Sequence, residues 1–87
     1  KKKERFTKEY KGKITAPFDG HGLDNSQIYL RTLLLKEFGI RTYLMIFEVP
    51  SGDIYGEFLD TLESKESHLM PNGKITIYPL YNFIKLN

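Results

Sequence analysis

The sequence contains no cysteine and no long apolar run, and these two absences limit the kinds of protein it can encode. Without cysteine, neither a disulfide framework nor a thiolate metal site can form, so packing and hydrogen bonds must hold the fold. The longest apolar runs, such as residues 33–35 and 44–47, are far shorter than the roughly 20 residues of a membrane-spanning helix. The charged N-terminus lacks the apolar stretch of a signal peptide. We therefore predict a cytoplasmic protein with no membrane partner.

Motifs that would mark an enzyme are also missing, because the chain has no phosphate-binding glycine loop, nucleophile elbow or paired-cysteine motif. The nearest approach to reactive chemistry is Asp19, His21 and Asp24 in a glycine-rich segment, with His68 farther along the chain. Their spacing matches no metal signature, and Asp24 is equally suited to capping a helix. We predict no catalytic residue, metal or cofactor, and keep a small ribonuclease using His21 and His68 as an alternative.

The 87 residues suffice for a single domain over residues 1–87, since a chain this short buries only about 60 to 65% of its unfolded surface. The formal net charge of +2 is divided unevenly along the chain. Residues 1–13 hold seven basic and two acidic side chains, whereas the remaining residues carry a net charge of −3. This division predicts a mildly acidic body with a basic N-terminus, of which residues 1–4 form a flexible arm.

One helix is predicted over residues 25–38. Asp24 or Asn25 can cap its first turn, and Gly39 is a typical left-handed terminator. The apolar side chains within it suggest a broad stripe facing a core: Ile28, Leu30, Leu33, Leu34 and Phe38.

The other elements are predicted as strands. Alternation of apolar and polar residues favours a strand over residues 5–16, and glycines favour a loop over residues 18–23. Three further strands are expected at residues 41–49, 54–62 and 74–86, separated by turns at residues 50–53 and 71–73, with a helical interpretation of residues 57–63 left open. The predicted class is α+β, with the helix on a mostly antiparallel four-stranded sheet in the order β-α-β-β-β.

A single helix covers only one face of such a sheet, yet the strands are apolar on both faces. Residues 41–49 place Tyr43, Met45, Phe47 and Val49 on one side and Leu44 and Ile46 on the other. Each large side chain left in water forgoes about 1.5 to 3 kcal/mol. We expect the second face to be covered by curling into a partial barrel, by a homodimer mate or by a foreign partner.

Between positions 48 and 66, Lys65 is the single basic residue among several acidic ones. The acidic residues therefore form a patch that could dock on a basic surface. We predict a small non-enzymatic protein that binds another macromolecule, such as an inhibitor or accessory factor acting on a nucleic-acid-handling protein. The composition is typical of AT-rich codons and favours a low-GC bacterium or its phages. The predicted partner-binding residues are Glu48, Asp53, Tyr55, Glu57, Asp60 and Glu63.

The alternative is a nucleic-acid-binding module built on the basic N-terminal strand. Basic side chains spaced along a strand can follow phosphates, and aromatic rings can stack on single-stranded bases. The residues of this alternative site are Lys1, Lys2, Lys3, Arg5, Lys8, Tyr10, Lys11 and Lys13.

Overall fold

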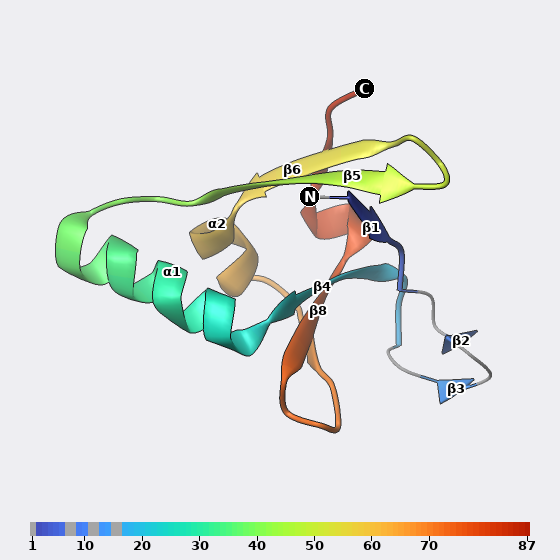
Figure 1. Cartoon of the computed structure of the whole chain (residues 1–87), viewed down its shortest axis with the longest axis horizontal. Helices are drawn as coiled ribbons and strands as arrows, with labels where there is room; N and C mark the ends of the chain where they lie inside the picture. The colour runs from blue at the N-terminus through green and yellow to red at the C-terminus, as the bar shows by residue number, and fades with distance from the viewer. Residues whose placement is uncertain (1, 7–8, 11–12, 15–16) are drawn as a thin grey trace.

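The computed structural model describes residues 2–6, 9–10, 13–14 and 17–87, and it confirms the predicted α+β class (Figure 1). A four-stranded sheet has the order β1 (Lys2–Glu4), β5 (Tyr43–Val49), β6 (Ile54–Phe58) and β9 (Ile84–Lys85), in which only the β1–β5 pairing is parallel. An antiparallel three-stranded sheet has the order β4 (Gly20–Asp24), β8 (Ile75–Pro79) and β7 (His68–Leu69). Within the described residues, these sheets do not close into a barrel.

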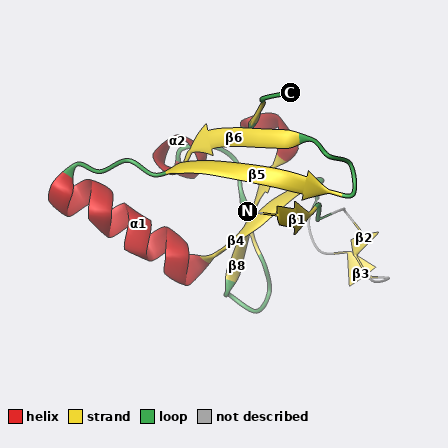
Figure 2. Ribbon diagram, turned by 45° about the horizontal axis from the view of Figure 1, so that its top comes forward, coloured by secondary structure: helices red, strands yellow, loops and turns green. Residues whose placement is uncertain are grey.

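The smaller elements complete the chain. Strands β2 (Glu9–Tyr10) and β3 (Lys13–Ile14) pair with each other, and a 3₁₀ turn (Leu80–Asn82) separates β8 from β9. Helix α1 (Asn25–Phe38) follows β4 directly, and the short helix α2 (Leu59–Glu63) follows β6. Figure 2 shows α1 lying to one side of the β5–β6 hairpin, joined to it by the segment after Phe38. No helix of the described residues reaches the length and apolarity needed to cross a membrane.

Helix α1 has the predicted bounds, and Gly39 ends it as expected. Gly39 adopts a left-handed conformation with φ 66°, its N–H donates to the carbonyl oxygen of Leu35, and the N–H of Ile40 donates to that of Leu34. The side chain of Asp24 makes no capping hydrogen bond. Asn25 instead accepts a hydrogen bond from Thr76 through its side-chain oxygen, which ties the start of α1 to β8.

The predicted loop at residues 18–23 is wrong, because Gly20–Asp24 forms strand β4 and pairs along the whole of β8. Here the glycines allow close packing between neighbouring strands, rather than forming a turn. A Cβ atom at Gly20 would collide with the carbonyl oxygen of Tyr78 on the neighbouring strand, so only glycine permits this approach.

Three other predicted strands are shorter than expected, and the one predicted at 54–62 ends at Phe58, where helix α2 follows in line with the helical alternative. Strands β2 and β3 pair antiparallel, so residues 5–16 are not one straight strand, and positions 7–8, 11–12 and 15–16 lie outside the described residues. The strand predicted at 74–86 breaks at the 3₁₀ turn, which sends β8 and β9 to different sheets. Lys2–Glu4, predicted as a flexible arm, forms β1 because its backbone pairs with β5.

The core lies between the two larger sheets and is closed by the first turns of α1 and by α2. It gathers one apolar cluster from these elements: Leu23, Ile28, Ile46, Tyr55, Leu59, Leu62, Tyr78 and Phe83. Ile28 is the only residue of α1 that is buried, so most of this helix lies outside the core.

Candidate functional site

The predicted acidic patch is divided by the fold. Glu48 is only 3% exposed and Tyr55 only 8%, so neither side chain is available to a partner in this conformation. Asp53 lies 3.4 Å from Lys85, and Glu57 accepts a hydrogen bond from the N–H of Phe58. The predicted partner-binding residues therefore do not form one continuous surface.

Glu48 is the centre of a buried polar cluster between the two larger sheets. Arg5 donates hydrogen bonds to both carboxylate oxygens, at 3.0 and 2.8 Å, and Ser51 donates a third at 2.7 Å. Burial alone would raise the pKa of Glu48, but these bonds and the contact with His21 lower it to about 2. The cluster links Glu48 of β5 to His21 of β4 and to Arg5, which directly follows β1, so it connects the two larger sheets.

The basic N-terminal residues that the structure describes turn inward. Lys3 donates a hydrogen bond from Nζ to the carbonyl oxygen of Gly22, and Arg5 is held by Glu48. Lys1, Lys8 and Lys11 lie outside the described residues, and the side chains of Lys2, Tyr10 and Lys13 do as well. The nucleic-acid alternative therefore stays a prediction, with Lys3 and Arg5 engaged in internal contacts.

The two histidines of the ribonuclease alternative do not come together. His21 is opposite Tyr78 and His68 is opposite Ile77 in the three-stranded sheet. Because neighbouring residues of a strand point to opposite faces, His21 and His68 lie on opposite faces of this sheet. In the described part of the chain, no three His, Asp or Glu side chains are grouped closely enough to hold a metal ion.

A groove opens between α1, the start of β5 and α2, and we call it the α1 groove. It consists of two adjoining cavities of about 240 and 320 Å³, which share Arg31, Thr42 and Leu59 in their walls. Their apolar walls come from residues of four elements: Leu23, Ile28, Leu35, Leu44, Met45 and Leu59. The groove is thus mostly apolar, with Arg31 and Thr42 where the two cavities meet and acidic residues at one end.

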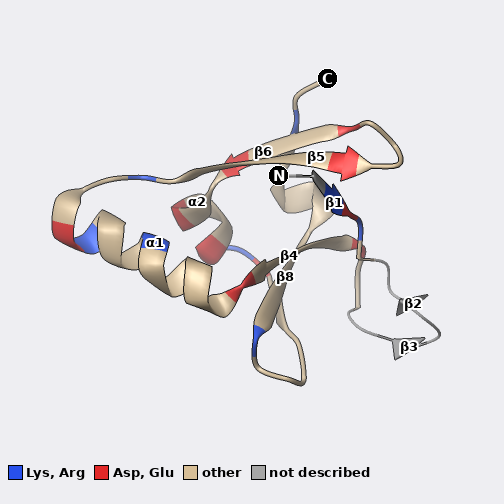
Figure 3. Cartoon of the chain, viewed as in Figure 1, with Lys and Arg blue, Asp and Glu red and all other residues tan. Residues whose placement is uncertain are grey.

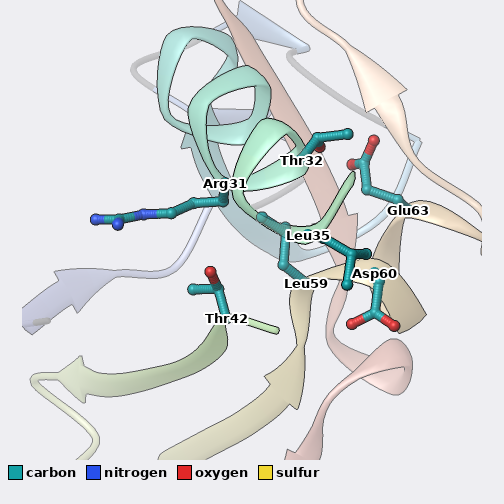
Figure 4. Close-up of a pocket in the computed structure, with 7 residues that line it drawn as sticks. All are labelled: Arg31, Thr32, Leu35, Thr42, Leu59, Asp60 and Glu63. Atoms are coloured by element: carbon teal, nitrogen blue, oxygen red, sulfur yellow. The ribbon is translucent and has the colours of Figure 1, made fainter. Parts of the chain in front are cut away.

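Two of the predicted partner-binding residues, Asp60 and Glu63, line the α2 end of this groove (Figure 4). Leu35 points from α1 toward Leu59 and Asp60, while Arg31 extends away from the acidic side chains. Asp60 forms a 3.0 Å ion pair with Arg41, and partial burial raises the pKa of Glu63. Figure 3 shows this concentration of acidic residues on α2.

The apolar side chains of helix α1 are spread over several sides of the helix, rather than in the single stripe predicted from the sequence. Besides the buried Ile28, the helix exposes 67% of Tyr29 and 72% of Phe38, and Leu30 is exposed as well. Large apolar side chains exposed near one another mark a candidate contact surface.

The apolar positions of α1 are the sequence signal for the α1 groove. Thr32, Leu35 and Thr42 were not predicted as site residues, although the apolar positions of α1 are too many for one stripe.

Comparison with protein-family models, with curated protein sequences and with solved structures finds no match to the chain.

Proposed function

We propose that this chain is a small, non-enzymatic binding protein that holds an apolar peptide segment of another protein in the α1 groove. The observation that carries the proposal is the groove itself. Its larger cavity, about 320 Å³, falls within the roughly 300 to 1,000 Å³ of known ligand pockets. Apolar side chains of the peptide occupy the two cavities, and the exposed apolar residues of α1 extend the contact.

Charge indicates the orientation of the peptide. Asp60 and Glu63 stand at the α2 end of the groove, whereas Gln27 and Arg31 stand nearer the start of α1. A basic residue of the peptide beside Glu63 would gain a favourable charge interaction, because Asp60 is already paired with Arg41. The preferred ligand therefore has two apolar side chains with Lys or Arg next to them on one side.

This proposal keeps the wider function predicted from the sequence, which is inhibition or assistance of a nucleic-acid-handling protein. Such proteins carry basic, solvent-exposed segments, since they bind phosphates with Lys and Arg. A basic-apolar segment of that kind matches the apolar walls and acidic end of the α1 groove.

The experiment is selection of peptides from a random library on the immobilised protein, followed by affinity measurement with soluble peptides. Thr32→Trp fills the groove from an exposed helical position that lines the first cavity. Glu37→Trp adds the same ring to α1 at a position that lines neither cavity. We expect selected peptides to bind Thr32→Trp at least about tenfold more weakly than wild type, as for loss of a central contact.

The matched control decides between the groove and general stickiness. Glu37→Trp should keep wild-type affinity, and both variants should keep the wild-type far-UV circular dichroism spectrum. Peptides that bind Thr32→Trp as tightly as wild type would show that the groove is not the binding site.

A further inference from the structure

The four-stranded sheet has a second apolar surface, on the side away from the core, which we call the outer face. The β5–β6 register pairs Tyr43 with Phe58 and Phe47 with Ile54, and the β6–β9 register brings Ile84 beside Gly56. Members of a directly opposed pair share one face of a sheet. The outer face therefore carries these side chains: Tyr43, Met45, Phe47, Val49, Ile54, Phe58, Ile84 and Leu86.

These side chains are exposed although they form an organised surface. Six of them are between 39% and 57% exposed, from Val49 at the low end to Ile84 at the high end. The rings of Tyr43 and Phe58 pack edge to face with centroids 5.0 Å apart, and the Tyr43 hydroxyl lies over Gly56. The centre of the outer face is thus filled by the Tyr43 side chain over Gly56.

Charge is confined to the edges of this face. No described residue of β5, β6 or β9 that points outward is charged. At one end, Arg41 covers the Phe58 ring at 3.8 Å and is paired with Asp60. At the β1 edge, Lys2 and Glu4 are in register with Phe47 and Val49. In a two-fold interface, each central group lies close to the same group of the other copy. A central charge would therefore be repelled by its equivalent in that copy. A face that is uncharged at its centre avoids this repulsion.

The area of the face also fits a second copy. Two-fifths or more of six large side chains is about 500 Å² of apolar surface, so two copies bury about 1,000 Å², the lower limit for a specific interface. The less exposed residues Ile54 and Phe58 add to this area, as does the Arg41–Asp60 pair at one end of the face. Two such sheets can stack face to face about 10 Å apart with their strands nearly aligned.

We infer that the outer face is the interface of a homodimer, in which the β5–β6–β9 faces of two copies pack together as a sheet sandwich. The outer face borders the α1 groove, because Tyr43 and Met45 belong to this face and also line the second cavity of the groove. The first cavity, lined by Thr32, Leu35 and Glu63, includes no residue of the outer face.

The test is sedimentation equilibrium of the full chain over micromolar to millimolar concentration, with two matched charge substitutions. Phe47→Lys places a charge on the outer face, and Phe38→Lys places one on α1, where the side chain is more exposed. We expect wild type and Phe38→Lys to form dimers, and Phe47→Lys to raise the dissociation constant at least about 30-fold, as at a binding hot spot. Circular dichroism should show that both variants remain folded.

A second measurement needs no variant. In a mixture of isotope-labelled and unlabelled wild-type protein, filtered nuclear Overhauser effects between copies should involve the methyl groups of Met45, Ile84 and Leu86. A wild-type chain that stays monomeric up to millimolar concentration would overturn the inference and assign the face to a foreign partner. A dimer that is broken by Phe38→Lys but not by Phe47→Lys would also overturn it.

Discussion

Nε2 of His21 lies 2.8 Å from Oε2 of Glu48 in the interior of the protein. Because the pKa of Glu48 is lowered to about 2, its carboxylate is ionised at neutral pH and only accepts hydrogen bonds. Nε2 must therefore carry the proton, which leaves Nδ1 as the acceptor of a neutral ring. Among the described residues, Nδ1 has no hydrogen-bond partner. The Glu48 contact thus fixes the tautomer of a fully buried histidine.

The first prediction concerns the stability that this cluster supplies. Glu48→Gln removes the buried charge but keeps the shape, so Arg5 loses its charged partner. We expect the free energy of unfolding to fall by about 2 to 3 kcal/mol, as for hydrogen bonds to charged groups. Asp60→Asn, which breaks the exposed Arg41 pair, should lower it by less than about 1 kcal/mol. Urea denaturation measures both, and equal losses would show that the buried cluster has no special role.

The second prediction is a loss of stability in acid. Burial lowers the pKa of His21, with the charges of Lys3 and Arg5 acting in the same direction and Glu48 opposing them. A lowered pKa means that the unfolded chain binds more protons than the folded chain, so stability decreases as the pH falls. The decrease begins near the ordinary His value of 6.5, and Glu48 adds a second decrease between 4.5 and about 2.

Urea midpoints measured from about pH 8 to about pH 3 would reveal this dependence. His21→Gln should remove the part that begins near 6.5 while leaving the Glu48 part in place. A midpoint that does not change between neutral and weakly acid pH would contradict the proposed neutral His21.

The third prediction compares two glycines. A Cβ at Gly20 would meet the backbone of Tyr78, which cannot move without breaking the β4–β8 pairing. A Cβ at Gly56 would meet the tips of the Tyr43 and Leu86 side chains, which can rotate away. Gly20→Ala should therefore cost about 3 kcal/mol or more, and Gly56→Ala about 1 kcal/mol, at the two ends of the range for overpacking. Thermal denaturation gives the order, and a larger effect at Gly56 would contradict the packing described.

Local patterns were enough to predict part of this fold. The bounds of α1 followed from its terminator Gly39, and the hairpin followed from the turn after Val49. The alternation of β5 also placed Tyr43 and Phe47 on one face correctly, because side-chain direction in a strand depends only on residue parity. These features depend on residues that are neighbours in sequence.

Features that depend on distant residues were missed. Glu48 lies on the same side of β5 as Leu44 and Ile46, which indicates a buried position. Its partners Arg5 and His21, however, lie 43 and 27 residues away in the sequence. The α1 groove was missed for a similar reason, since it depends on how α1 and α2 lie beside β5. Only its acidic end was named, because Asp60 and Glu63 are conspicuous as charges alone.

The fourth prediction tests the acidic end of the α1 groove with a peptide that carries one basic residue. Glu63→Gln should weaken binding about two- to fivefold, which is the range of a single exposed ion pair. Added salt should weaken binding to wild type more than to Glu63→Gln, because screening acts on the charge that the variant lacks. Glu37→Gln removes the same charge from a position outside the groove and should leave affinity unchanged. Equal losses in the two variants, measured by isothermal titration calorimetry, would mean that general charge attraction rather than Glu63 selects the peptide.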